Sequence, residues 1–200
     1  MFFRFNILTY NNNYPKITKM SLKQLTIQQH QNAERQKFAG VLMSGEIPKK
    51  FYLIYLINQH ACYHALETHS LFILPHQNLN RVDKIKEDIN ELNDVLKLDI
   101  TSVLTKSTMD YISHVKNIKS QEDFNAHVYV RYLGDLRGGQ MIAKKIPGKG
   151  CYYDFEEPNE LAVSIYEILN DDMAEEAKKV FTFATRLFVE MHDLMISDLN

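Results

Sequence analysis

A chain of 200 residues has the size of one ordinary domain, although two small domains would also fit this length. With 45% hydrophobic and 11% aromatic residues it can bury a substantial core, which excludes a disordered chain. A net charge of -2 gives no reason to expect a nucleic-acid partner, because such partners favour strongly basic surfaces.

The N-terminal segment differs in composition from the rest of the chain. Residues 1–19 contain Arg4, Lys16 and Lys19 but no Asp or Glu. A basic, acid-poor start is one feature of organelle targeting segments. Serine and arginine are scarce, however, so we favour a disordered extension, or translation that begins at Met20. We therefore divide the chain into an extension or leader, residues 1–19, and one domain, residues 20–200.

The first helix is predicted from Ser21 to about Gly40. Ser21 and Gln24 form a capping-box pattern, which marks a helix start. Gly40 follows as a stop signal. The apolar periodicity places four residues on the more buried side of this helix: Leu22, Leu25, Ile27 and Phe38.

Helical patterns continue to the end of the chain. Pro48 can open a helix over residues 49–73 that Pro75 ends, and a charged amphipathic run covers 82–98. A long pattern covers 122–146 and stops at Pro147 and Gly148, Pro158 permits another start, and a last helix covers about 172–194. Since no repeat, linker or alternating strand pattern interrupts them, we predict one all-α domain.

Two cysteines, Cys62 and Cys151, lie far apart and without a second pair. They predict free thiols in a reducing compartment, not a disulfide framework or a zinc site. No stretch approaches the ~18 apolar residues that a membrane-spanning helix needs, so we expect a soluble protein without a membrane anchor.

Three of the seven glycines, Gly134, Gly138 and Gly139, fall within one otherwise helical segment. Each should cost about 1 kcal/mol relative to alanine, so another role must offset that cost. Arg131 and Asp135 share the same helix face. This face is either a bare backbone patch that lets a flat ligand approach, or a glycine kink packed on another helix beside an ordinary Arg131–Asp135 surface pair.

The segment 131–140, Arg-Tyr-Leu-Gly-Asp-Leu-Arg-Gly-Gly-Gln, closely resembles the distal helix of heme oxygenases, whose pattern is RYLGDLSGGQ. Residues 30–34, His-Gln-Asn-Ala-Glu, resemble the family's proximal H-x-x-A-E, with Phe38 and Gly45 at the familiar spacing. A weaker likeness to the final helix covers 175–181 and 187–188. The resemblance spans about residues 21–195.

The resemblance implies a single helical domain that holds heme between a proximal helix and a kinked distal helix. It implies an oxidoreductase that uses O2 and reducing electrons to open heme to biliverdin, with release of carbon monoxide and ferrous iron. His30 would be the iron ligand, with Glu34 one turn later to orient its imidazole. From the residues alone, His30 would rank no higher than His60 or His64.

The family pattern also assigns roles to other residues. Asp135 would be catalytic by organising water, Arg131 would join that network, and the three glycines would let the distal helix approach the heme. Lys23 and Tyr129 would contact the heme propionates, although a solvated lysine is as good a reading of Lys23 alone. Two features depart from the family: Arg137 stands in the serine position, and residues 161–170 carry no Lys or Arg.

Other classes of protein explain the sequence less well. A ferritin-type di-iron protein would need Glu-x-x-His pairs, which the chain lacks. Thiaminase-like or quinone-cofactor-synthesis proteins would not account for His30 with Glu34 or for residues 131–140. The serious alternative is a heme-binding store or sensor without turnover. For an active enzyme we expect a ferredoxin or flavin reductase as electron donor, a downstream bilin reductase as a further partner, and a location in the cytoplasm or, if residues 1–19 are a targeting segment, the plastid stroma.

Overall fold

The computed structural model describes residues 21–97 and 104–198, so the predicted extension at residues 1–19 lies outside the described residues. Within them the chain is helical and contains no strand, which confirms the all-α prediction. The longer elements in chain order are α1 (Leu22–Glu34), α2 (Lys37–Ser44), α3 (Lys49–Glu67), α4 (Val82–Leu96), α5 (Lys106–Lys116), α6 (Gln121–Gly134), α8 (Pro158–Tyr166) and α9 (Ala174–Ser197). The short elements are η1 (Gln77–Leu79), η2 (Asp135–Gly139), α7 (Gln140–Ile142), η3 (Cys151–Tyr153) and η4 (Asp171–Met173).

The first predicted helix is in fact two helices. Its start is confirmed, because Ser21 and Gln24 make both hydrogen bonds of the capping box. Its predicted end is wrong, because Gln36 takes an extended backbone that interrupts the helix. A second helix begins at Lys37 and ends before Gly45, which takes the left-handed conformation (φ 83°). Of the residues predicted on the buried side, Ile27 is 40% exposed. The break turns α2 so that Phe38 enters the core.

Helix α3 begins after Pro48 as predicted but ends at Glu67, before the predicted residue 73. The apolar residues that suggested a longer helix, Leu71 and Ile73, are exposed. The Glu67 carboxylate accepts hydrogen bonds from the backbone N–H groups of Arg81 (2.6 Å) and Val82 (3.1 Å), and it thereby caps the start of α4.

The sequence patterns did not lead us to predict helix α5. Thr105 is its N-cap and accepts a hydrogen bond from the N–H of Thr108. Glu190 of α9 accepts a further hydrogen bond from the N–H of Ser107 (2.9 Å). The signal was present as a threonine cap before the buried residues Tyr111 and Val115, which are four apart.

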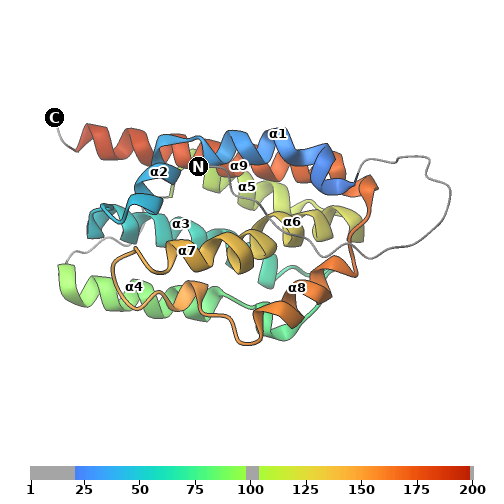
Figure 1. Cartoon of the computed structure of the whole chain (residues 1–200), viewed down its shortest axis with the longest axis horizontal. Coiled ribbons are helices and arrows are strands. Elements are labelled where there is room, and N and C mark those ends of the chain that lie inside the picture. Colours follow the sequence, from blue (N-terminus) through green and yellow to red (C-terminus); the bar gives the residue numbers. More distant parts are fainter. Residues whose placement is uncertain (1–20, 98–103, 199–200) are drawn as a thin grey trace.

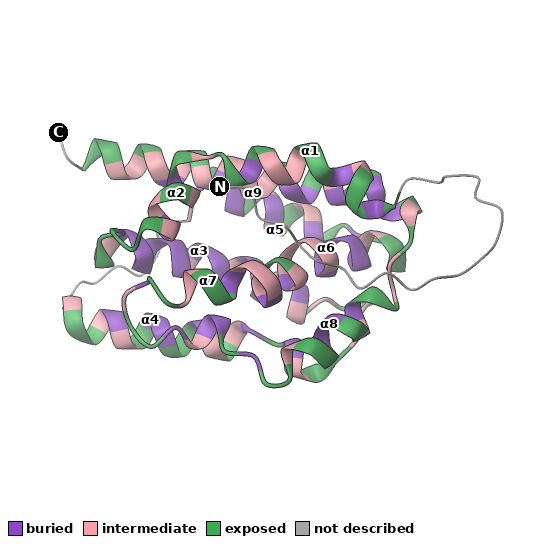
Figure 2. Ribbon diagram, viewed as in Figure 1, coloured by how far each residue is buried: buried purple, intermediate pink, exposed green. Residues whose placement is uncertain are grey.

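The helices pack around one continuous core. Helix α1 lies along α9, α3 packs on α4 and α5, and α6 also contacts α9 (Figure 1). In Figure 2, α3 is buried along most of its length, while α4 and α8 expose one face each. The glycine-rich segment forms a π-helical turn, η2, between α6 and α7, so the predicted kink in the distal helix takes the form of a wider turn.

Candidate functional site

A cavity of about 420 Å³ lies between the proximal elements α1, α2 and α9 and the distal elements α3, α6, η2 and η3. It contains most of the predicted site residues and has mainly apolar and aromatic walls. Five of the predicted residues on the distal side line it, together with two on the proximal side: Arg131, Gly134, Asp135, Gly138, Gly139, His30 and Glu34. The fold therefore brings the two motifs, about 100 residues apart in sequence, to opposite walls of one space.

The proximal wall presents His30 and Glu34. They occupy successive turns of α1, and His30 Nδ1 lies 3.5 Å from a carboxylate oxygen of Glu34. The ring of Phe181 on α9 meets the His30 ring edge-on, with 5.5 Å between the ring centroids. These contacts orient the imidazole and leave its Nε2 available as a ligand atom.

The distal wall presents Asp135. Tyr63 of α3 donates a hydrogen bond to its carboxylate. Burial raises the pKa of Asp135 to about 6, although hydrogen bonds from Tyr63 and Tyr152 oppose that rise. The carboxylate is thus mostly ionised at neutral pH, yet its pKa is close enough to neutrality for proton exchange.

Arg131 is a partly buried cation that contacts two other helices. Its guanidinium lies 4.0 Å from the centre of the Tyr111 ring on α5, and one of its N–H groups donates to Gln59 of α3 (3.0 Å). Its Nε is buried with no hydrogen-bond partner among the described residues. Arg131 is therefore no surface partner of Asp135, which rejects that alternative reading of the motif.

The three glycines of the motif have two different roles. Gly134 and Gly138 line the cavity, and a Cβ at either position would meet no atom within 4 Å. At Gly139 a Cβ would lie 2.4 Å from Cδ1 of the buried Tyr153 ring. The first two glycines leave a bare wall that a flat ligand can approach, and the third allows η2 to pack on η3.

Replacements at two of these glycines should separate their roles. We expect Gly138→Leu to fold and to lose affinity for a flat ligand, because its side chain would fill the cavity. We expect Gly139→Ala to lose about 1–3 kcal/mol of stability by overpacking against Tyr153. Thermal unfolding and heme titration of the two variants check this. A stable Gly139→Ala variant, or undiminished binding by Gly138→Leu, would contradict the assignment.

Sequence reasoning missed the tyrosines of η3, Tyr152 and Tyr153, which line the distal wall. Asp88 of α4 holds this segment, because its carboxylate accepts from the backbone N–H groups of Cys151 and Tyr152 (2.8 Å each). Arg81, 5% exposed, donates to the carbonyl oxygens of Tyr152 (3.4 Å) and Asp154 (2.7 Å). The pair Tyr152–Tyr153 in an irregular segment was the available signal, since buried tyrosines need polar partners.

Two predicted residues do not line the cavity, Lys23 and Tyr129. Lys23 is exposed near the start of α1, and the Tyr129 hydroxyl lies 3.4 Å from Thr26 Oγ1. By contrast, Phe181 and Phe188 of α9, which were not among the predicted site residues, do line the cavity. Their positions show that the aromatic spacing of the last helix serves the cavity wall as well as the core.

Arg137, the residue in the family's serine position, also lines the cavity. Its Nη1 donates a hydrogen bond to Asn159 Oδ1 of α8 (3.3 Å). A cation therefore lies at the cavity beside α8, and residues 161–170, which begin in α8 and extend past its end, carry no Lys or Arg.

The raised pKa of Asp135 predicts how stability varies with pH. Between about pH 4 and 6, folded Asp135 keeps a proton that the unfolded chain has lost, so stability should fall as pH rises through this range. Asp135→Asn removes this contribution. We expect the melting temperature of the heme-free parent to decline more steeply across this range than that of the variant. Parallel pH profiles would show that Asp135 titrates normally.

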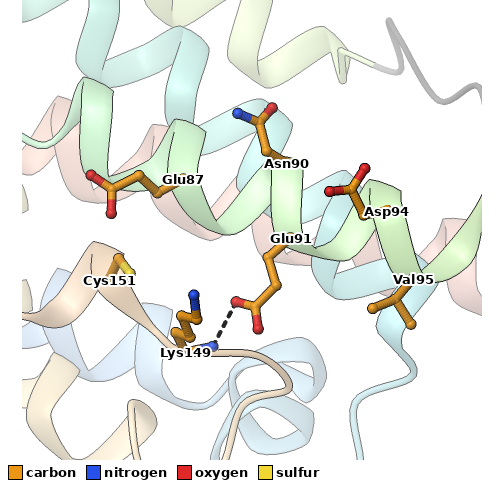
Figure 3. A pocket seen from close by; sticks show the side chains of 7 residues that line it. All are labelled: Glu87, Asn90, Glu91, Asp94, Val95, Lys149 and Cys151. Atoms are coloured by element: carbon orange, nitrogen blue, oxygen red, sulfur yellow. Dashed lines mark hydrogen bonds between the residues drawn. The ribbon is translucent and has the colours of Figure 1, made fainter.

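A second hollow, of about 500 Å³, lies between α4 and the segment before η3 (Figure 3). Carboxylates of α4 border it, and the Lys149 N–H donates to Glu91 (2.9 Å). Burial and the nearby Asp88 carboxylate raise the pKa of Cys151 to about 11. A protonated thiol among carboxylates offers no ligand for heme iron, so we place the functional site in the first cavity.

The fold and the first cavity define a helical protein suited to a flat, iron-bearing ligand. A histidine stands on one wall, and a carboxylate and bare glycines stand on the other. Two features fit such a ligand: the buried Arg131 Nε, which has no hydrogen-bond partner among residues 21–97 and 104–198, and the open space at Gly134 and Gly138.

Comparisons with known proteins agree with this class. The heme oxygenase family model matches residues 18–167. The heme oxygenase of Porphyra purpurea is 28% identical over 88% of this chain and 86% of its own length. That of Pyropia yezoensis is 32% identical over 68% of this chain and 64% of its own length. Heme oxygenase-1 of Synechocystis sp. PCC6803, solved in complex with heme, has a TM-score of 0.75 at 20% identity over 89% of this chain and 93% of that one. The structure from Leptospira interrogans has a TM-score of 0.69 at 24% identity over 84% and 98%.

The chain belongs to the heme oxygenase family, whose members are oxidoreductases that bind and degrade heme. Within the described residues, no helix is both long and apolar enough to cross a membrane.

Proposed function

We propose that this protein opens heme to biliverdin and releases carbon monoxide and ferrous iron, using O2 and electrons from a reductase. The observation that carries the proposal is the shared cavity, with His30 on one wall and Asp135 with the bare glycines on the other. Heme, as substrate and cofactor, would supply the iron that activates O2 and the ring that is opened.

On the proximal side, His30 would present neutral Nε2 to the iron. Glu34, 3.5 Å from Nδ1, would accept the ring's other proton directly or through a water. That contact would fix the tautomer and raise the basicity of the ligand. The Phe181 ring would limit rotation of the imidazole.

On the distal side, Asp135 would hold water and transfer protons. Its carboxylate receives the Tyr63 hydroxyl, and with a pKa of about 6 it can take up and release a proton near neutral pH. Arg131 would stabilise this arrangement from its place between Gln59 and Tyr111. Gly134 and Gly138 would let the backbone lie against the heme face and steer oxygen toward the ring edge.

The heme propionates would be held by cations and hydrogen-bond donors at the cavity mouth. We assign this role to the Lys23 and Arg137 cations and the Tyr129 hydroxyl together, because a single exposed ion pair contributes only about 0–1 kcal/mol. Lys23 and Tyr129 would have to reach the propionates from outside the cavity lining. Arg137 has the strongest support, since it lines the cavity beside a helix segment without Lys or Arg.

A turnover experiment distinguishes an enzyme from a heme store or sensor. The full chain is loaded with heme without oxygen, reduced with a ferredoxin or flavin reductase, and then exposed to air. We expect the heme spectrum to give way to that of biliverdin, with one equivalent of carbon monoxide released. A stable heme–O2 spectrum without product would favour the store. We further propose a cytoplasmic or plastid-stromal location, with a bilin reductase as the consumer of the product.

A further inference from the structure

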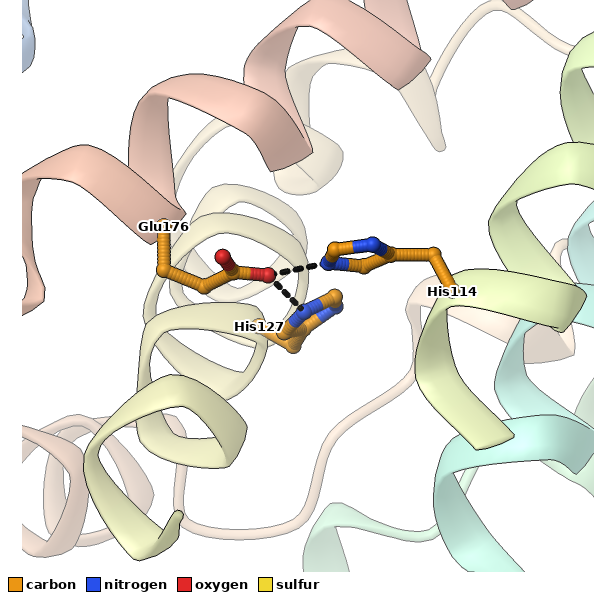
Figure 4. A group of neighbouring side chains, drawn as sticks. All are labelled: His114, His127 and Glu176. Carbon is orange, nitrogen blue, oxygen red and sulfur yellow. Dashed lines mark hydrogen bonds and ion pairs between the residues drawn. The ribbon is translucent and has the colours of Figure 1, made fainter. Parts of the chain in front are cut away.

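Outside the cavity, three side chains from three helices meet at one point (Figure 4). His114 comes from α5, His127 from α6 and Glu176 from α9. Their ligand atoms all lie within 4.8 Å of one another. Both imidazoles direct Nε2 at the same carboxylate oxygen, Glu176 Oε1: His127 at 3.1 Å, and His114 in a direct hydrogen bond.

The cluster lies largely inside the protein but can be reached from solvent. His127 is fully buried, Glu176 is 6% exposed and His114 is 29% exposed. Two buried polar groups thus face a third that borders the surface. An ion could enter past His114, which lies in the last turn of α5 and is the most exposed of the three.

The atoms that face away from the meeting point are already held. His127 Nδ1 lies 2.8 Å from the Tyr111 hydroxyl, and Lys179 donates to the other Glu176 oxygen, Oε2, at 2.8 Å. Such outer contacts orient the ligands of metal sites. They leave Nε2 of each histidine and Oε1 of Glu176 directed at a common centre.

We propose that His114, His127 and Glu176 form a site for a divalent transition metal of the zinc type, separate from the heme cavity. Two imidazoles and one carboxylate are a known ligand set for tetrahedral Zn²⁺ with a water in the fourth position. The metal takes the place between Nε2 and Oε1 that hydrogen bonds now occupy, so His114 moves outward to admit it.

Metal binding at this site changes the hydrogen bond to Tyr111. Without metal, the Glu176 carboxylate can only accept, so His127 Nε2 carries the proton and Nδ1 accepts from the Tyr111 hydroxyl. With metal on Nε2, the proton moves to Nδ1, which then donates to Tyr111. Because the Arg131 guanidinium lies over the Tyr111 ring, the metal site contacts the heme site through one side chain.

The test uses Co²⁺, whose visible absorption reports four-coordinate geometry, added to the heme-free full chain. We expect one equivalent to bind, Zn²⁺ to displace it, and Zn²⁺ to raise the melting temperature of the protein. His114→Ala changes a partly exposed residue and should fold, and Glu176→Gln keeps the shape of the side chain. Each should weaken Co²⁺ binding at least about tenfold and abolish the rise in melting temperature.

Two controls remove the competing histidines. His30→Ala removes the histidine of the heme cavity. His60→Ala/His64→Ala removes a pair of stacked histidines, four residues apart on α3. Both should bind Co²⁺ as the parent does. The proposal is overturned if the parent binds no Co²⁺, if His114→Ala binds it unchanged, or if either control variant loses it. In ¹⁵N spectra, movement of the His127 proton from Nε2 to Nδ1 on Zn²⁺ addition is expected, and an unchanged tautomer counts against the site.

Discussion

Asp135→Ala is expected to bind heme like the parent and to form biliverdin at least about 100-fold more slowly. Asp135 receives the Tyr63 hydroxyl at the distal wall, and burial sets its pKa at about 6. Alanine removes both the anchor for water and the group that exchanges protons. Heme affinity should persist, because the apolar walls and His30 are unchanged. Single-turnover spectra with a chemical reductant measure both quantities.

Two matched variants sharpen this test. Tyr63→Phe keeps the ring but removes the donor to Asp135, so it should slow turnover less than Asp135→Ala does. Asp94→Ala changes an exposed carboxylate of α4 outside the cavity and should behave as the parent. If Asp135→Ala produces biliverdin at the parental rate, the distal assignment is wrong.

His30→Ala should lose the parental ferric heme spectrum and nearly all turnover. Among the described residues, His30 is the histidine that lines the cavity, so its removal leaves the iron without a histidine ligand from that lining. The imidazole-sized space that remains, beside Phe181 and Glu34, should accept free imidazole and recover part of the parental spectrum. Absorption spectra with and without imidazole, followed by turnover, measure these effects.

His60→Ala and His64→Ala provide the comparison for this variant. Both histidines lie on α3 and neither lines the cavity. Each should leave the heme spectrum unchanged. An unaltered spectrum in His30→Ala, or a lost one in a control, would move the ligand role to another histidine.

Helix starts were predictable where a local capping residue or proline marked them. The Ser21 capping box, Pro48 and Pro158 each marked a helix start that the structure confirms. Helix ends were predicted less well. The break at Gln36 and the early stop at Glu67 depend on packing and on the hydrogen bonds that Glu67 accepts at the start of α4, which periodicity does not encode.

The candidate site likewise contains residues that the sequence motifs predicted and contacts that they did not predict. The motifs placed His30, Glu34, Arg131 and Asp135 together because their identities and order match one family. No sequence pattern predicted that Tyr63 would reach Asp135, since that contact joins α3 to η2 across 72 residues. The same holds for the cluster of His114, His127 and Glu176, which forms only when three helices pack together.

The π-helical turn η2 constrains the length of the distal segment as well as its composition. A π turn holds about one residue more than an α turn, although both complete one rotation about the helix axis. In an α-helix, successive side chains are about 100° apart around that axis. Deleting one residue within Asp135–Gly139 would therefore leave one regular α turn, and the residues after it would keep nearly the same helix faces. Gln140, whose amide donates to the Tyr153 carbonyl at 2.7 Å, would then still face η3. The loss would fall on the turn itself, which supplies Asp135 and Gly138 to the cavity wall. A one-residue deletion here should thus impair the site more than it impairs the packing of the helix that follows.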